Sequence, residues 1–215
     1  MKFVITLSTY NRCDYLGKTI ESLNASDIPL DVDFLVIDDG STENTEKEIE
    51  KLIFPRVHIK QEKNLGNEVT TKNLFQMAIN RLGADVIVNI DADALFKQDW
   101  FKKMMDLFYQ FRGEAIISGF NTTAHHHKIL KRESSYVQKA SVGGLGLMMK
   151  ANYALPGGFN FVYAPIPNLT WDGRLSRYAE FWGIPIIVTT PSRIQHIGEI
   201  GVNSRPSFYD TAADF

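Results

Sequence analysis

The stretch that decides the fold is Val86-Ile87-Val88-Asn89-Ile90-Asp91-Ala92-Asp93. Its first part is apolar and β-branched apart from Asn89, which is typical of a strand buried on both faces of a parallel sheet. Asp91 and Asp93 follow at alternate positions, where an extended chain directs both carboxylates to the same side. Such a pair repels and needs a cation or a shared proton between its members. Because Mg²⁺ and Mn²⁺ prefer oxygen ligands, this strand end predicts a metal site.

A plainer interpretation is that carboxylates at strand ends only solvate loops or cap helices. The surrounding pattern favours the chemical interpretation. Upstream, predicted strands lie at 3–7, 34–37 and 57–59, and predicted helices lie at 15–23, 45–53 and 68–82. Strands that alternate with helices indicate parallel βαβ units, whose ligands bind at the carboxyl ends of the strands. The predicted fold class is therefore α/β, with a mixed, mostly parallel central sheet flanked by helices.

Downstream of this stretch the pattern becomes less regular. Predicted helices lie at 100–111 and 175–182, and predicted strands lie at 115–120, 144–149 and 186–188. The polar stretch 121–135 is predicted to be a long loop, which in a compact domain is usually functional. It contains His125, His126 and His127, whose spacing lacks the partners of a zinc site. No linker interrupts the chain, so residues 1–215 are predicted to form one domain.

Composition and charge restrict the classes of function. The chain has 215 residues, 44% of them hydrophobic, and a formal net charge of -2, so no nucleic-acid partner is expected. Cys13 is the only cysteine, which excludes an intrachain disulfide and favours a reducing, cytoplasmic location. No stretch reaches the roughly 20 apolar residues of a transmembrane helix. The N-terminus also lacks the longer apolar region of a secretory signal. The sequence therefore predicts a soluble protein.

Four segments together resemble one known family. They are Val4-Ile5-Thr6-Leu7-Ser8-Thr9-Tyr10-Asn11-Arg12, Val36-Ile37-Asp38-Asp39-Gly40-Ser41-Thr42, Asn64-Leu65-Gly66 with Lys72-Asn73, and Asn89-Ile90-Asp91-Ala92-Asp93. In this order they resemble four sequence elements of GT-A glycosyltransferases, especially those of family 2. The last of the four is the family's Asp-x-Asp element. A looser likeness continues through 143–150 and 156–159. The resemblance implies a single GT-A (Rossmann-like) domain. Its nucleotide-sugar-binding half would be 1–98, its acceptor-binding half 99–200, and its lid or tail 201–215.

The resemblance also implies which residues bind the donor. The expected donor-binding side chains are those of Thr9, Tyr10, Arg12, Asp38, Asp39, Lys72 and Asp91. Thr9 and Tyr10 would line the nucleobase pocket, and Arg12 would lie near the nucleotide. Asp39 would accept hydrogen bonds from the base, expected to be uracil, or from the ribose. Lys72 would contact the base or the phosphates, and Asp91 would orient the ribose or the donor sugar.

The metal ion and the leaving group have their own expected residues. Asp93 would bind Mn²⁺ or Mg²⁺, because it is the last acid of the Asp-x-Asp element. His196 follows the last predicted core strand, where several GT-A families place a metal-binding histidine, and imidazole is a reasonable ligand for Mn²⁺. Arg205 would lie in the lid segment and neutralise the departing diphosphate, as lids commonly complete a site.

Asp172 is the predicted catalytic base. An inverting transfer needs a base that takes the proton of the acceptor hydroxyl. Asp172 is the only carboxylate between Glu133 and Glu180, so it is the sole acid available if this region forms the acceptor side. The family has a Glu-Asp pair at this place, and Trp171 stands where the Glu is expected. A competing interpretation makes Asp172 only the cap of a helix that starts near Arg174.

The predicted function is therefore transfer of a sugar from a nucleoside diphosphate-sugar, UDP-linked, to a hydroxyl acceptor on a glycan, a protein or a lipid-linked molecule. Inversion at the anomeric carbon is expected. A retaining enzyme would not need Asp172 as a base. A nucleotidyltransferase would open with a glycine-rich phosphate loop, whereas this chain has Ser8-Thr9-Tyr10-Asn11-Arg12. A non-catalytic module would bind the nucleotide-sugar or a carbohydrate without releasing diphosphate.

Overall fold

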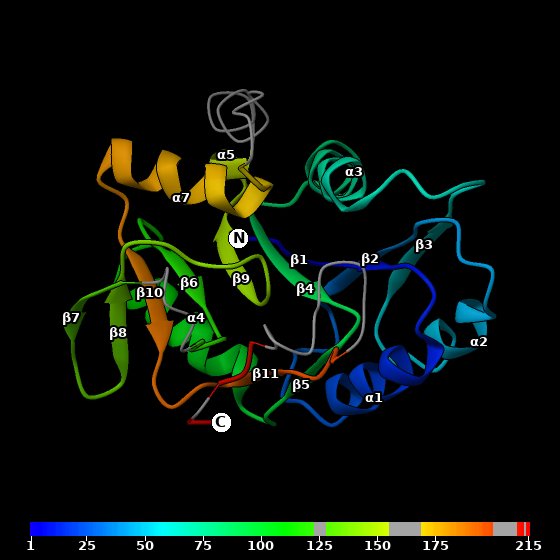
Figure 1. The fold of residues 1–215 in the computed structure, drawn as a ribbon, viewed down its shortest axis with the longest axis horizontal. Coiled ribbons are helices and arrows are strands. Elements are labelled where there is room, and N and C mark those ends of the chain that lie inside the picture. The colour runs from blue at the N-terminus through cyan, green and yellow to red at the C-terminus, as the bar shows by residue number, and fades with distance from the viewer. Residues whose placement is uncertain (123–127, 155–168, 200–209, 213) are drawn as a thin grey trace.

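The computed structural model describes residues 1–122, 128–154, 169–199, 210–212 and 214–215. Within these residues the centre of the molecule is a nine-stranded sheet in the order β3-β2-β1-β4-β9-β6-β10-β8-β7 (Figure 1). Its strands are β1 (Phe3–Thr9), β2 (Asp33–Asp38), β3 (Arg56–Lys60), β4 (Val86–Asp91), β6 (Ile116–Ser118), β7 (Ile129–Arg132), β8 (Tyr136–Lys139), β9 (Leu147–Lys150) and β10 (Ile186–Thr189). The predicted α/β fold class with a mixed sheet is thereby confirmed.

The strand order brings the acidic residues to one edge of the sheet. β1 lies between β2 and β4 and is parallel to both. In this register Thr9 pairs with Asp38, and Ser8 pairs with Asp91. The carboxyl ends of these three strands therefore meet, as expected for a ligand site in a parallel sheet. β9 then enters antiparallel to both β4 and β6, which makes the sheet mixed.

Helices cover both faces of the sheet (Figure 1). They are α1 (Cys13–Asn24), α2 (Thr45–Ile49), α3 (Asn67–Asn80), α4 (Trp100–Gln110), α5 (Ala151–Ala154) and α7 (Trp171–Trp182). In β1, Ile5 and Leu7 belong to the core that includes α1 and α4, whereas Val4 belongs to the core that includes α3 and α7. None of the three has exposed surface, and burying one such side chain stabilises the fold by about 1.5–3 kcal/mol. Burial on both faces explains the unbroken apolar run.

A second, two-stranded sheet was not predicted from the sequence. β5 (Ala94–Phe96) pairs antiparallel with β11 (Ile194–His196), and His196 lies opposite Ala94. This pairing brings a residue near the end of the chain beside Asp93. Three-residue strands contain too few positions to show a periodic pattern, so the sequence gives no signal for them.

Several predicted elements are corrected by the structure. The stretch 121–135 is not a loop throughout, because β7 lies within it and pairs with β8, which was also missed. β7 is an edge strand with exposed charged side chains such as Lys131 and Arg132, and such a strand lacks the apolar alternation of a buried one. The helix α7 begins at Trp171, before the predicted 175, and α2 ends at Ile49, before the predicted 53. No helix in the described ranges is long and apolar enough to cross a membrane.

Candidate functional site

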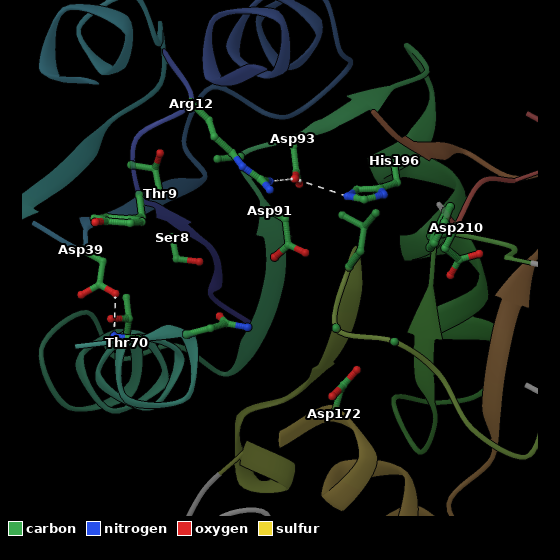
Figure 2. A pocket seen from close by; sticks show the side chains of 18 of the residues that line it. Ser8, Thr9, Arg12, Asp39, Thr70, Asp91, Asp93, Asp172, His196 and Asp210 are labelled. Carbon is green, nitrogen blue, oxygen red and sulfur yellow. Dashed lines mark hydrogen bonds and ion pairs between the residues drawn. The ribbon is translucent and has the colours of Figure 1, made fainter. Parts of the chain in front are cut away.

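The carboxyl ends of β1, β2 and β4 open into a cavity of about 560 Å³ (Figure 2). Its described lining residues are Ser8, Thr9, Tyr10, Arg12, Asp39, Asn64, Gly66, Asn67, Thr70, Asp91, Ala92, Asp93, Phe120, Gly143, Gly144, Leu145, Asp172, His196 and Asp210. The set includes most of the predicted site residues. The sequence analysis assigned no role to Asn67, Thr70, Phe120 or Asp210.

The loop that carries Tyr10 and Arg12 is held by the turn after β2. Asn11 and Arg12 both have left-handed backbone, with φ of 54° and 61°, which is uncommon for residues other than glycine. The Asn11 backbone N–H donates to the Ser41 Oγ at 2.7 Å, and the Asn11 Oδ1 accepts from the Thr42 backbone N–H at 2.9 Å. These bonds compensate the strain of the loop and direct Arg12 toward the cavity.

Asp93 is the acid of the site that contacts two basic side chains. Its Oδ2 accepts a hydrogen bond from the Arg12 guanidinium and lies 3.3 Å from the Nε2 of His196 (Figure 2). The backbone of Gly198 approaches this carboxylate so closely that a Cβ there would collide with it. Burial would raise the pKa of Asp93, but the hydrogen bond and charge of His196, with the charge of Arg12, lower it. Asp93 is therefore an anion held by basic neighbours.

His196 is oriented from two sides. A second hydrogen bond joins it to the backbone of Asp210, and Asp93 lies on its Nε2 side. Burial would lower the pKa of His196, but the hydrogen bond and charge of Asp93, and the charge of Asp91, raise it. A backbone hydrogen bond of this kind is how proteins commonly fix the orientation of metal-binding imidazoles.

Asp91 lies in the middle of the cavity and has the most perturbed carboxyl group there (Figure 2). Burial, and then the charge of Asp93, raise the pKa of Asp91 to about 7, with a smaller contribution from Asp172. His196 and Arg12 lower it only in part. The site consequently holds a surplus of negative charge at Asp91, which a proton or a cation would neutralise.

The two acids at the carboxyl end of β2, Asp38 and Asp39, have different roles. Asp39 is almost fully buried, and its two oxygens accept hydrogen bonds from the backbone N–H groups of Leu65 at 2.8 Å and Gly66 at 2.9 Å. It lines the cavity and fixes the turn that opens α3. Asp38 has no exposed surface, and its carboxylate accepts from the Ser41 backbone and the Thr45 hydroxyl. Asp38 therefore supports the turn, and the prediction that it binds the donor is wrong.

The other residues predicted to bind the donor differ in where they lie. Thr9 and Tyr10 line the cavity, Thr9 buried and Tyr10 exposed. Lys72 lies farther along α3, and in the described part of the chain it is not among the residues that line the cavity. Arg205 and the histidines 125–127 lie outside the described residues.

Asp172 points into the cavity from the first turn of α7, on the side away from Arg12 (Figure 2). Because α7 begins at Trp171 and its N-cap residue is Thr170, Asp172 is not the cap of a helix near Arg174. That competing interpretation is wrong. The position of Asp172 opposite Asp91 and Asp93 leaves the cavity between the predicted base and the predicted metal-binding acids.

A buried polar residue of β4 supports the same wall. The Asn89 Nδ2 donates to the Gly144 carbonyl at 3.0 Å, and the Asn89 Oδ1 accepts from the Thr6 hydroxyl at 3.1 Å. Asn89 thus fixes the 143–145 segment that lines the cavity. The signal for this role was present in the sequence, because a lone amide in an apolar strand needs buried partners.

The side chains present fit a divalent cation in part. Asp93 and His196 supply an oxygen and a nitrogen ligand in contact, and Asp91 supplies further negative charge. Across the described residues, however, no group of three or more His, Cys, Asp or Glu side chains is arranged to hold a metal ion. A metal ion at Asp93 would also have to displace Arg12, and its remaining ligands would have to come from the substrate or from water.

Comparison with solved structures identifies the fold. Staphylococcus aureus TarS 1-349 in complex with UDP-GlcNAc superposes with a TM-score of 0.67 at 17% identity, over 94% of this chain and 62% of that chain. The Pyrobaculum calidifontis mannosyltransferase PcManGT, in complex with GDP-Man and Mn²⁺, gives a TM-score of 0.62 at 15% identity, over 89% and 56%. The fold is that of the GT-A glycosyltransferases.

The sequence comparison names the family. The model of glycosyl transferase family 2 matches residues 4–141, more than half of the chain, and the chain belongs to this family. An uncharacterized glycosyltransferase of Mycoplasma genitalium is 31% identical over 108 residues, which are 49% of this chain and 36% of that protein. The chain therefore spans about a third of this relative and about three fifths of the solved neighbours. The predicted resemblance to family 2 is confirmed.

Proposed function

We propose that this chain transfers a sugar from a UDP-sugar to a hydroxyl acceptor with inversion at the anomeric carbon. The observation that carries the proposal is the position of Asp172, which faces Asp91 and Asp93 across one cavity. Donor-side residues and a candidate base thus meet in a single space. Membership of glycosyl transferase family 2 supports this class of reaction.

The donor would lie at the carboxyl ends of β1, β2 and β4, where the cavity opens. The base and ribose would lie against Thr9, Tyr10 and Asp39, and the diphosphate would lie near Arg12 and the acids of the Asp-x-Asp element. Solved neighbours were obtained in complex with UDP, UDP-GlcNAc and GDP-Man, which supports a nucleoside diphosphate-sugar. Two of these neighbour structures were obtained with UDP or a UDP-sugar, and UDP is therefore the nucleotide that we propose.

Asp93 and His196 would hold a divalent cation, Mn²⁺ or Mg²⁺, with Asp91 close by. When bound, the ion would stabilise the negative charge of the departing diphosphate as a Lewis acid. Arg12 releases Asp93 in this arrangement and becomes available to the diphosphate, for which its guanidinium is well suited. Lys72 and Arg205 are further proposed donor contacts, on α3 and in the 201–215 segment.

Asp172 would act as the general base. It takes the proton of the acceptor hydroxyl as the acceptor oxygen bonds to the anomeric carbon and the bond from that carbon to the diphosphate oxygen breaks. The products are the glycosylated acceptor, the nucleoside diphosphate and the protonated Asp172. The acceptor is proposed to be a hydroxyl of a glycan, a protein or a lipid-linked molecule.

The decisive test is a transfer assay with UDP-sugars and GDP-sugars in the presence of Mn²⁺, read as release of the nucleoside diphosphate and as melting temperature. We expect release that depends on an added acceptor, and a melting temperature that rises with donor concentration, as mass action requires. Donor-dependent stabilisation without release under any acceptor would instead support a binding module. Stabilisation by no nucleotide-sugar would contradict the donor site itself.

A further inference from the structure

One carboxylate joins α3, which follows the turn held by Asp39, to α7, the helix that carries Asp172. Glu68 lies in the first turn of α3. Its Oε1 accepts a hydrogen bond of 2.7 Å from the backbone N–H of Trp171, and its Oε2 pairs with the Arg174 guanidinium. Trp171 is the first residue of α7 and precedes Asp172 directly. The contact therefore ends one residue from the proposed base.

Glu68 supplies a cap that α7 lacks in its own sequence. The first N–H groups of a helix have no partner within the helix, and a side chain usually satisfies one of them. The N-cap residue Thr170 makes no side-chain capping bond. Glu68 accepts from the first of these groups and brings negative charge to the positive end of the helix dipole.

Arg174 adds a second contact between Glu68 and the first turn of α7. It is only 7% exposed, and its Nη1 also donates to the Leu169 carbonyl at 2.5 Å. A buried guanidinium that bonds a carboxylate and a carbonyl together holds the first turn of α7 in one orientation. The Trp171 ring adds an edge contact to Phe75 of α3, with the ring centroids 5.6 Å apart.

The other side of the same turn of α3 faces the cavity. Gly66, the N-cap residue of α3, donates its N–H to Asp39, and Asn67 and Thr70 line the cavity. The described contacts thus form one continuous series: Asp39 holds the start of α3, the first turn of α3 carries Glu68, and Glu68 holds the start of α7. The first and last of these links are hydrogen bonds to a helix N-terminus.

We propose that Glu68 is a positioning residue that fixes Asp172 toward the acceptor hydroxyl from the nucleotide side of the cavity. The proposal rests on the proposed function, in which Asp172 is the base. Glu68 touches no reacting atom in this scheme and acts through the first turn of α7. Displacement of a reacting group by about 1 Å can lower a rate about 10²-fold, so a loss of this contact should reduce kcat more than donor affinity.

The test is a double-mutant cycle on the intact chain. It compares wild type, Glu68→Ala, Asp172→Asn and the double variant. The readouts are kcat in a transfer assay, UDP affinity in calorimetry and melting temperature. We expect Glu68→Ala to lower kcat about 10–100-fold with UDP affinity unchanged within about twofold. The same change should have little effect in the Asp172→Asn background, because coupled residues are not additive.

Two further variants keep the result interpretable. Glu68→Gln retains an acceptor for the Trp171 N–H, so it should recover part of the kcat lost in Glu68→Ala. If Glu68→Ala shows no melting transition, the cycle is run with Glu68→Gln alone. The matched control is Glu180→Gln, which removes an exposed ion pair with Arg177 on the same helix and should keep the wild-type kcat.

Three outcomes would overturn the inference. The first is a wild-type kcat in a Glu68→Ala protein that is folded and binds UDP. The second is a loss of equal size in the wild-type and Asp172→Asn backgrounds, which would show a general structural role. The third is a wild-type protein that binds UDP and transfers no sugar, which would overturn the proposed function and this inference with it. The third differs visibly from the first two, in which wild type is active.

Discussion

The guanidinium of Arg12 lies on the carboxylate of Asp93, the residue proposed to bind the metal ion. Arg12 reaches it from a left-handed backbone position at the start of α1, with φ of 61°. His196 contacts the same Oδ2. Asp93 is thus already neutralised by protein groups, so a metal ion must compete with Arg12 for it.

The first prediction is that Arg12→Ala tightens Mn²⁺ binding to the free protein. A hydrogen bond between charged groups is worth about 1.5–3 kcal/mol, and about 1.4 kcal/mol is a factor of ten in affinity. We therefore expect Mn²⁺ affinity to rise about tenfold in calorimetry, while UDP affinity falls because the diphosphate loses a cation. The matched control is Arg112→Ala, since Arg112 also has positive φ, 54°, but lies on the surface after α4.

The metal assignment has its own control in Asp93→Asn. This variant should abolish Mn²⁺-dependent binding of the nucleotide-sugar and keep the fold. Equal Mn²⁺ affinities in wild type, Arg12→Ala and Asp93→Asn would show that the ion binds elsewhere or not at all.

The second prediction concerns pH and Asp91. Its pKa of about 7 in the folded protein is above the ordinary value of 3.8. Between these values the folded state keeps a proton that the unfolded chain has released. The contribution of Asp91 to the free energy of unfolding should therefore fall as pH rises from about 4 to 7, with the whole loss present above that window. Asp91→Asn removes the titrating group and should show a flatter pH dependence.

The measurement is urea unfolding at pH 5 and pH 8 without divalent ions. Wild type should lose more stability than Asp91→Asn between the two values, and Mn²⁺ should restore part of the loss at pH 8. The exposed acid Asp106, which pairs with Lys102 on α4, supplies a control as Asp106→Asn. Parallel pH curves for wild type and Asp91→Asn would contradict the raised pKa.

The third prediction separates Asp39 from its neighbour Asp38. Asp39→Asn turns one acceptor into a donor that faces the N–H of Leu65 or Gly66, so the turn before α3 loses a bond. UDP affinity should fall by about 1–3 kcal/mol, the cost of an unpaired buried group. Any preference for UDP over GDP should narrow as well, if this carboxylate also contacts the base.

Asp38→Asn is the matched control for this prediction. Asp38 is buried beside Asp39 and supports Ser41 and Thr45 without lining the cavity. It should lower the melting temperature with a smaller change in UDP affinity. The proposal that the nucleotide lies against Asp39 fails if Asp38→Asn weakens UDP binding more than Asp39→Asn does.

The first half of the fold was predictable because its strands are buried on both faces. Val4 and Ile5 point to opposite faces, as do Val86 and Ile87, and all are fully buried, so apolar runs mark the strands without any periodicity. Parallel order then places the strand ends together, which made Asp39, Asp91 and Asp93 recognisable as one acidic edge. β7 was not predicted, because it lies exposed at the edge of the sheet and therefore has no buried apolar run.

The candidate site was only partly predictable, since two of its features depend on contacts between distant segments. His196 reaches Asp93 through the β5–β11 pairing, and Glu68 meets Trp171 across 103 positions of the chain. No local pattern encodes such contacts. Family resemblance placed His196 correctly beside Asp93, but neither resemblance nor pattern indicated Glu68.

The last prediction concerns Asp172, because it separates inversion from retention and both from mere binding. Asp172→Asn preserves the size of the side chain and its place in the first turn of α7, so UDP and Mn²⁺ affinities should stay within about twofold of wild type. Transfer should fall about 10²–10⁴-fold, the usual contribution of a positioned general base. The readout is the product's anomeric configuration by NMR, together with calorimetry on both proteins.

The outcomes of this experiment differ in kind. An inverted product with a slow Asp172→Asn variant supports the base. A product that keeps the donor's configuration rules out a single displacement with Asp172 as its base, even if the variant is inactive, because a single displacement inverts the anomeric carbon. Lost UDP affinity in the variant would place Asp172 on the donor side of the cavity. Asp172 lies across the cavity from Arg12 and Asp93, and on the proposed function we expect the first result.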